Sequence, residues 1–143
     1  PELDRAAFLT GGWYRSGDIG RLDAEGYLTI TDRKKDIIIR GGENISAKEV
    51  EDLLATLPQV VESAVTAMPD PELGERVCAF VVTRDGAPLG LEDVRAHFMK
   101  AGVARQKTPE RVIVVDDFPR TPSGKVKKNE LREQLRAEAK ERA

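Results

Sequence analysis

The fold is decided by residues 37–58, which read IIIRGGENISAKEVEDLLATLP. The β-branched run at the start favours a strand, and the Gly-Gly pair ends it because glycine tolerates backbone angles that other residues resist. Ser46 and Glu49 have the spacing of a helix capping box, and Pro58 stops the helix. The apolar positions of this helix fall on one face: Ala47, Val50, Leu54 and Leu57. The segment therefore predicts a strand followed by a capped amphipathic helix.

The rest of the chain continues this alternation of strands and helices. Residues 60–67 and 77–83 are rich in Val and Ala and predict strands, with a loop over 68–74. A second amphipathic helix carries Leu91, Val94, Phe98 and Ala101 and ends at Gly102. Residues 112–115 predict a further strand, and a last helix begins near Asn129. We expect an α+β fold, a small mixed or antiparallel sheet with three packed helices.

A β-hairpin precedes this domain. Arg21-Leu22 and residues 27–30 flank the turn residues 23–26, after a short helical turn near the start of the chain. Residues 32–36 include Asp32, Arg33, Lys34 and Lys35, whose charges we do not expect in a core. The expected organisation is residues 1–31 as a hairpin, 32–36 as a linker and 37–143 as the α+β domain. Because residues 1–10 read like the interior of a longer sequence, we expect a fragment of a larger polypeptide.

The composition favours an ordinary globular domain over several other classes. The chain has 143 residues and a formal net charge of -2, so it offers no general attraction to nucleic acid. A single cysteine, Cys78, cannot form an intramolecular disulfide, and no membrane-length apolar run is present. A cytoplasmic location without a membrane span is the expectation. Cys78 lies in an apolar strand and His97 has no paired Cys or Ser motif, so neither predicts a nucleophile, and no metal-ligand cluster is visible.

The strongest candidate for chemistry is Lys125, in the loop PRTPSGK of residues 119–125. The prolines and glycine favour an extended loop whose tip presents one long cation. A phosphate-binding Walker loop is excluded, because Pro119 stands where that pattern needs glycine and Val126 where it needs Ser or Thr. A Gly-Lys pair alone is usually a solvated turn, and the basic run that continues through Lys127 and Lys128 reads most simply as the approach to a helix.

Further motifs accompany this loop: YRSGD at residues 14–18, DRKKD at 32–36, RGGENI at 40–45 and EVE at 49–51. In this order and spacing the chain resembles the adenylate-forming superfamily of acyl-CoA synthetases, aryl-acid adenylating enzymes, peptide-synthetase adenylation domains and firefly luciferase. The resemblance covers nearly the whole chain. It implies a mobile C-terminal domain, with the hairpin as the end of a large N-terminal adenylation domain that is the partner of this chain.

The resemblance assigns ATP- and AMP-binding roles to three residues. Asp18 is similar to the aspartate that holds the ribose hydroxyls of ATP, and Arg33 to the arginine that also contacts the ribose. Lys125 is similar to the lysine that reaches the α-phosphate and the acyl carboxylate during adenylation, where a positioned cation stabilises the developing charge. Lys35 falls at the family's hinge, whereas Lys34 reads as solvated. The resemblance places the ligands of Mg²⁺ in the N-terminal domain.

CoA binding is assigned to a second set of residues. Gly41 and Gly42 match glycines that line the pantetheine tunnel, although they also suit a simple bend between a strand and a helix. Arg76 and Lys107, together with Arg105 and Arg111, could meet the CoA phosphates, and a solvated surface suits each of them nearly as well. The chain departs from the family where some ligases stack adenine between aromatic residues, because Leu73 and Gln106 stand there.

These assignments predict part of an AMP-forming acid-thiol ligase of fatty-acid or aryl-acid metabolism, which converts a carboxylate, ATP and CoA into acyl-CoA, AMP and diphosphate. The fragment alone is expected to be inactive. Two alternatives stay open: an aryl-acid adenylating enzyme that loads a carrier protein, and a noncatalytic module derived from a synthetase.

Overall fold

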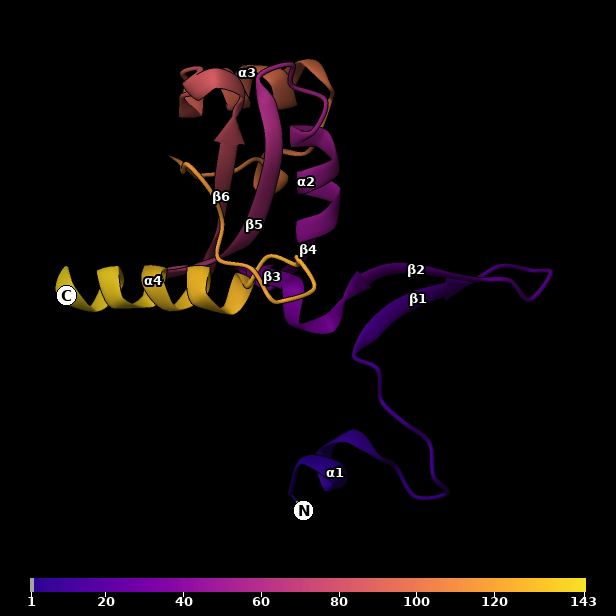
Figure 1. The fold of residues 1–143 in the computed structure, drawn as a ribbon. Helices are drawn as coiled ribbons and strands as arrows, with labels where there is room; N and C mark the ends of the chain where they lie inside the picture. Colours follow the sequence, from indigo (N-terminus) through magenta and orange to yellow (C-terminus); the bar gives the residue numbers. More distant parts are fainter. Residues whose placement is uncertain (1) are drawn as a thin grey trace. The chain divides into compact units, whose positions relative to one another are not determined.

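The computed structural model describes residues 2–143, apart from the side chain of Leu3. The chain divides into two compact units, the first ending at Lys35 and the second beginning at Asp36. This division falls inside the 32–36 segment expected as a linker. A 3₁₀ turn over Lys34–Asp36 spans it (Figure 1).

The first unit contains α1 (Glu2–Ala7) and an antiparallel hairpin of β1 (Asp18–Leu22) and β2 (Leu28–Arg33). The Asp23 carboxylate caps the turn, accepting hydrogen bonds from the amides of Glu25 at 3.0 Å and Tyr27 at 2.9 Å. The predicted hairpin is therefore present, with longer strands than expected. Large apolar side chains of this unit are exposed, among them Trp13, Leu22, Tyr27, Leu28 and Ile30.

The linker prediction was wrong about Asp32. β2 continues to Arg33, and Asp32 within it is only 9% exposed, whereas Arg33, Lys34 and Lys35 are exposed as expected. One carboxylate oxygen of Asp32 accepts a hydrogen bond from the amide of Arg33 at 2.8 Å. Asp32 is the only buried residue of β2, since Leu28 and Ile30, which point to the same side of the strand, are exposed. The charge pattern of the segment therefore gave no sign of this burial.

The second unit is an α+β domain with a five-stranded mixed sheet (Figure 1). Its elements are β3 (Ile37–Arg40), β4 (Glu43–Ser46), α2 (Ala47–Leu54), β5 (Val60–Asp70), β6 (Gly74–Thr83), α3 (Leu91–Lys100), β7 (Arg111–Val114) and α4 (Lys128–Glu141), with 3₁₀ turns at Arg84–Gly86 and Arg105–Lys107. The strands follow the order β4-β3-β6-β5, and β7 pairs with β6 in parallel while the other pairs are antiparallel. The predicted fold class is confirmed.

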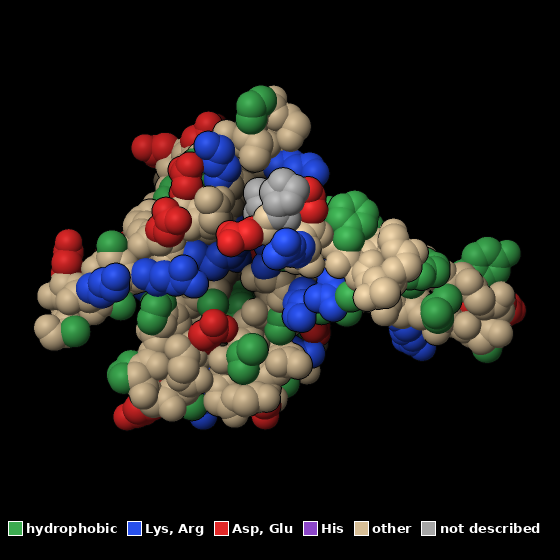
Figure 2. Space-filling view, turned by 90° about the horizontal axis from the view of Figure 1, so that it is seen from below, with side chains coloured by type: hydrophobic (Ala, Val, Ile, Leu, Met, Phe, Trp, Pro, Cys, Tyr) green, Lys and Arg blue, Asp and Glu red, His purple; other side chains and the backbone are tan. Residues whose placement is uncertain are grey.

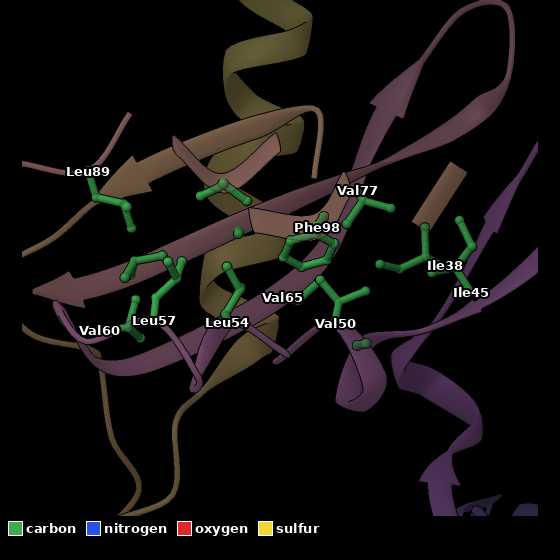
Figure 3. Packing of buried hydrophobic residues seen from close by; sticks show 14 residues of the cluster. Ile38, Ile45, Val50, Leu54, Leu57, Val60, Val65, Val77, Leu89 and Phe98 are labelled. Atoms are coloured by element: carbon green, nitrogen blue, oxygen red, sulfur yellow. The ribbon is translucent and has the colours of Figure 1, made fainter. Parts of the chain in front are cut away.

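Two apolar clusters sandwich the sheet. Alternation along β6 sends Val77, Ala79 and Val81 into the larger cluster, and Cys78 and Phe80 into the smaller one. The larger cluster includes buried residues of α2 and α3, and Figure 3 shows several of them around the fully buried Phe98. The smaller cluster includes Leu131 and Leu135, the thin apolar stripe of α4. Helices therefore cover both faces of the sheet.

The predicted helix cap is confirmed, since the Ser46 hydroxyl accepts a hydrogen bond from the amide of Glu49 at 3.1 Å. The strand β4 was missed, because Ile45 is its one buried apolar residue and a single position gives no alternating pattern. The loop predicted over residues 68–74 is longer than the observed loop. β5 runs on through Met68 and the exposed Pro69 to Asp70, so the loop shrinks to residues 71–73.

None of the helices among residues 2–143 combines the length and the apolar character that a bilayer crossing requires.

Candidate functional site

Lys125 lies in a closed hairpin rather than in the extended loop that its prolines suggested. The amide of Thr121 donates to the Lys125 carbonyl at 2.8 Å, and the amide of Gly124 donates to the Thr121 carbonyl at 2.8 Å. The Thr121 hydroxyl accepts a hydrogen bond from the Lys125 amide at 3.1 Å, and Arg120 pairs with Val126 in an antiparallel bridge. The Lys125 side chain is exposed, and its ammonium group has no hydrogen bond or ion pair with any described residue. The hairpin therefore presents one unpaired cation to solvent.

Arg120 connects this hairpin to the sheet. Its guanidinium bonds both carboxylate oxygens of Glu62 on β5, one at 3.1 Å, and one oxygen of Asp117 at 3.2 Å. It also donates to the carbonyl of Gly124 at 3.2 Å, directly before Lys125. Hydrogen bonds to Glu62, and then to Asp117, raise the pKa of Arg120 above its ordinary value. Arg120 belongs to the PRTPSGK motif, but the sequence did not indicate a role for it, because its partner Glu62 is far away in the sequence.

The helix that follows the hairpin is also tied down by ion pairs. Lys128 binds Glu51 of α2 at 2.5 Å, and the same Glu51 oxygen accepts the amide of Val65 on β5 at 2.8 Å. Arg132 pairs with Asp36 at 3.2 Å. Figure 2 shows Lys and Arg side chains in a row over the α4 surface, which carries such residues four positions apart: Lys128, Arg132, Arg136 and Lys140. The start of α4 is thus fixed to the domain core, and the Lys125 hairpin sits on a rigid base.

Asp18 and Arg33 lie together in the first unit, as partners of the β1–β2 hairpin. Arg33 Nε is 3.2 Å from Asp18 Oδ1, and both side chains stay partly exposed. A hollow of about 520 Å³ adjoins this pair, and basic residues form much of its wall: Arg33, Lys34 and Lys35, with Ser16 and Gly17. The carboxylate of Asp18, which can accept hydrogen bonds, therefore lies beside the guanidinium of Arg33, which can donate them. Lys34 and Lys35 add positive charge to the same surface.

Gly41 and Gly42 form the two-residue turn between β3 and β4. Their φ values of 55° and 86° lie in the left-handed region that favours glycine. The amide of Gly41 donates to the Leu73 carbonyl at 2.9 Å, and a Cβ on Gly41 would come within 3.2 Å of the Leu73 side chain. A Cβ on Gly42 would meet open space. The two glycines therefore form the bend between a strand and the next element that the sequence suggested. Because Gly42 has no side chain, the outer side of this turn carries no side-chain atoms at that position.

Arg76 belongs to an ion-pair network beside this turn. Its guanidinium binds Asp70 Oδ2 at 2.5 Å and also Glu110, which in turn accepts from Arg40 Nε at 2.6 Å. The amide of Leu73, followed by the Arg76 guanidinium, holds the pKa of Asp70 below its ordinary value. A pocket of about 600 Å³ is lined by four arginines of this region, Arg40, Arg76, Arg95 and Arg105, together with Glu110. Carboxylates pair with three of these arginines, namely Arg40, Arg76 and Arg95, and so neutralise part of the positive charge.

Lys107 lies in a different place from Arg76. Its ammonium binds both carboxylate oxygens of Glu49, at 2.9 and 3.0 Å, at the edge of an apolar groove of about 340 Å³ between α2 and residues 98–107. The structure therefore does not bring Lys107 and Arg76 into one pocket. Leu73 packs on Gly41, and Gln106 is partly buried in a 3₁₀ turn.

Cys78 and His97, which the sequence did not predict to be nucleophiles, are engaged in burial and hydrogen bonding. Cys78 is fully buried, and burial raises the pKa of its thiol to about 12. His97 Nε2 makes a 2.7 Å hydrogen bond with the Thr56 hydroxyl. Within the described part of the chain, no three His, Cys, Asp or Glu residues are grouped as metal ligands would be.

The candidate groups thus lie in exposed or partly exposed positions on strands, turns and loops of the two units. The second of these units is a compact α+β domain. The chain belongs to the family of the AMP-binding enzyme C-terminal domain, whose sequence profile matches residues 49–125.

Relatives with known names agree with this assignment. Medium-chain fatty-acid–CoA ligase of Escherichia coli K12 is 51% identical over 138 residues, which cover 94% of this chain and 24% of that protein. A salicylyl-CoA synthase/salicylate adenylyltransferase of a Streptomyces species is 50% identical over 138 residues, which cover 96% of this chain and 25% of that protein. The crystal structure of ATP-bound MatB from Rhodopseudomonas palustris superposes with a TM-score of 0.84 at 41% identity, covering 94% of this chain and 26% of MatB. The chain spans about a quarter of the length of these relatives.

Proposed function

We propose that this chain is the C-terminal part of an AMP-forming acyl-CoA synthetase, an acid-thiol ligase that converts a carboxylate, ATP and CoA into acyl-CoA, AMP and diphosphate. The observation that carries the proposal is the exposed, unpaired Lys125 on a closed hairpin in a domain of the AMP-binding family. A relative of similar sequence is named as a fatty-acid–CoA ligase. We propose a cytoplasmic location, where ATP and CoA are both available.

In the first half-reaction a carboxylate oxygen attacks the α-phosphorus of ATP and diphosphate leaves. Negative charge accumulates on the nonbridging oxygens, and Lys125 stabilises it as a point charge. Asp18 accepts hydrogen bonds from the ribose hydroxyls, and Arg33, which lies 3.2 Å from it, supplies donors to the same sugar. We place the ligands of Mg²⁺ in the N-terminal adenylation domain.

In the second half-reaction the CoA thiol attacks the acyl-adenylate and AMP leaves. The bare outer side of Gly42 allows the pantetheine arm to pass close to the backbone, and Gly41 keeps the turn in place. Arg76 stands in the four-arginine pocket, a setting suited to the phosphates of CoA. Lys107 is a second candidate for a phosphate contact, which requires it to exchange its present partner Glu49.

The two half-reactions require the domain to present different faces to one active site. Lys35 lies at the boundary between the two compact units, and we assign it as the hinge. The apolar side chains exposed on the first unit, such as Leu22, Tyr27 and Leu28, suit burial against the N-terminal domain of the same polypeptide.

The second candidate is an aryl-acid adenylating enzyme that loads a carrier protein. It is supported by a relative whose printed name, salicylyl-CoA synthase/salicylate adenylyltransferase, includes an aryl-acid adenylating activity beside a CoA-ligase activity, and whose identity of 50% is almost that of the fatty-acid–CoA ligase. Both chemistries use a pantetheine thiol, so turnover with free CoA separates them. A noncatalytic module ranks lower, because Asp18, Arg33 and Lys125 are all retained in exposed or partly exposed positions.

The test is Lys125→Ala in the full-length enzyme, measured in single turnovers of each half-reaction. Acyl-adenylate formation should fall about a hundredfold or more, by comparison with the removal of one oxyanion donor. Thioester formation from presynthesised acyl-AMP and CoA should continue near the parent rate. Lys100→Ala removes an exposed lysine of α3 and is the matched control. Normal adenylation by Lys125→Ala would refute the proposed role.

A further inference from the structure

Arg120 is part of the Lys125 hairpin, yet its side chain makes contacts on three sides. The guanidinium bonds Glu62 through two nitrogens, which is the planar fork that arginine can form with a carboxylate and lysine cannot. The nitrogen that bonds Glu62 Oε1 also donates to the Gly124 carbonyl, and the other bonds Asp117. One side chain thus joins a strand of the sheet, the segment before the hairpin and the residue that precedes Lys125.

The hairpin does not depend on Arg120 for its closure. Backbone bonds between Thr121, Gly124 and Lys125 close it, and the bond from the Lys127 amide to the Pro119 carbonyl, at 2.8 Å, holds its base. What the guanidinium adds is a link from the hairpin to β5, which is paired with β6 along its length. That link ties the Gly124 carbonyl, directly before Lys125, to a strand of the sheet.

We propose that Arg120, held by Glu62 and Asp117, is a positioning residue that fixes the Lys125 hairpin for the adenylation half-reaction. The inference rests on the role proposed for Lys125. Its physical basis is that a displacement of about 1 Å in a charge-stabilising group can cost roughly a hundredfold in rate. A hairpin tied to the core at Gly124 restricts such displacements.

Glu62 distinguishes positioning from a direct contact between Arg120 and a substrate phosphate. If Arg120 bound phosphate itself, removing the negative charge of Glu62 would free the guanidinium and leave adenylation unchanged or faster. If Arg120 positions the hairpin, removing that charge weakens the tie and slows adenylation. Glu62→Gln keeps the shape of the side chain while it loses the ionic fork.

The experiment compares Arg120→Ala, Arg120→Lys, Glu62→Gln and the double variant Arg120→Ala/Glu62→Gln in the full-length enzyme, with single-turnover assays of both half-reactions. Arg120→Ala should slow acyl-adenylate formation roughly tenfold or more while the KM for ATP and for the carboxylate changes less than about twofold. Arg120→Lys keeps the charge but not the fork, so it should recover only part of the rate. Glu62→Gln should also slow adenylation, and the double variant should be no slower than Arg120→Ala.

Thioester formation from acyl-AMP and CoA should stay near the parent rate in all of these variants. Arg136→Ala, which removes an exposed arginine of α4, controls for the loss of one positive charge. Equal loss of both half-reactions would overturn the inference in favour of a general structural role, and faster or unchanged adenylation in Glu62→Gln would overturn it in favour of direct contact. Lys125→Ala in the same assay separates the proposed role of Lys125 from the positioning role of Arg120. If Lys125→Ala adenylates slowly and Arg120→Ala adenylates normally, the positioning inference alone fails. If Lys125→Ala adenylates normally, both proposals fail.

Discussion

Replacement of Phe98 by alanine tests the packing of the α+β domain. Phe98 is fully buried on α3, within the cluster formed by α2, α3 and the sheet (Figure 3). Truncation of a buried phenylalanine to alanine costs about 3–5 kcal/mol, from lost transfer free energy and from the cavity that remains. Phe98 also lines the apolar groove with Val50 and Leu53, so the space left by truncation adjoins this groove instead of forming a closed cavity. We therefore expect about 3 kcal/mol, the lower end of the range.

The assay is urea unfolding of the 143-residue chain, followed by far-UV circular dichroism. Tryptophan fluorescence is unsuitable, because the single tryptophan, Trp13, lies in the first unit and not in the domain under test. A loss of about 3 kcal/mol lowers the midpoint by roughly 1–3 M urea. Met99→Ala is the control, since this neighbour is 79% exposed and its truncation should change the free energy of unfolding by less than about 0.5 kcal/mol. Similar midpoints for the two variants would refute the placement of α3.

Two further predictions concern ionisable groups in the second unit. Burial raises the pKa of Glu110, but hydrogen bonds from Arg40 and Arg76 outweigh it, so the folded-state pKa lies below the ordinary value of 4.5. The stabilisation from this carboxylate is therefore present above its unfolded-state pKa and lost as the pH falls through the folded-state pKa. The gap in unfolding midpoint between the parent chain and Glu110→Gln should shrink as the pH is lowered from about 6 to about 3, and a gap that widens would contradict the network. Cys78, with its pKa raised to about 12, should resist iodoacetamide at neutral pH until urea unfolds the domain, as a mass-spectrometric time course would show.

Local patterns predicted the elements that have strong local signals. Ser46 and Glu49 gave the helix cap, and the residues rich in Val and Ala gave β5 and β6, because each signal lies within a few residues of sequence. The sequence did not predict β4, because this strand buries only one residue. It did not predict the burial of Asp32 either, because β2 extends beyond its apolar residues. In both places pairing with a neighbouring strand extends the structure beyond what the residues indicate by themselves.

The candidate site divides in the same way. The motifs singled out Lys125 as a candidate, whereas the closed hairpin that carries it and the partners of Arg120 could not be found from spacing. Glu62 is 58 residues from Arg120, and Glu110 is 70 residues from Arg40. Carboxylates this far apart in sequence give no local signal, and only the sheet order brings each beside its arginine. The separate positions of Arg76 and Lys107 were equally hidden from the sequence.

The strand β5 links both proposed faces of the domain. Near its start, Glu62 binds Arg120 and through it the carbonyl before Lys125. At its end, Asp70 accepts the amide of Leu73, and the Leu73 carbonyl accepts the amide of Gly41. Eight residues of strand separate the two anchor points, which corresponds to about 26 Å at roughly 3.3 Å per residue. Because the two proposed faces are anchored at different points of one strand, the arrangement is in line with the proposed rotation of the domain between the two half-reactions.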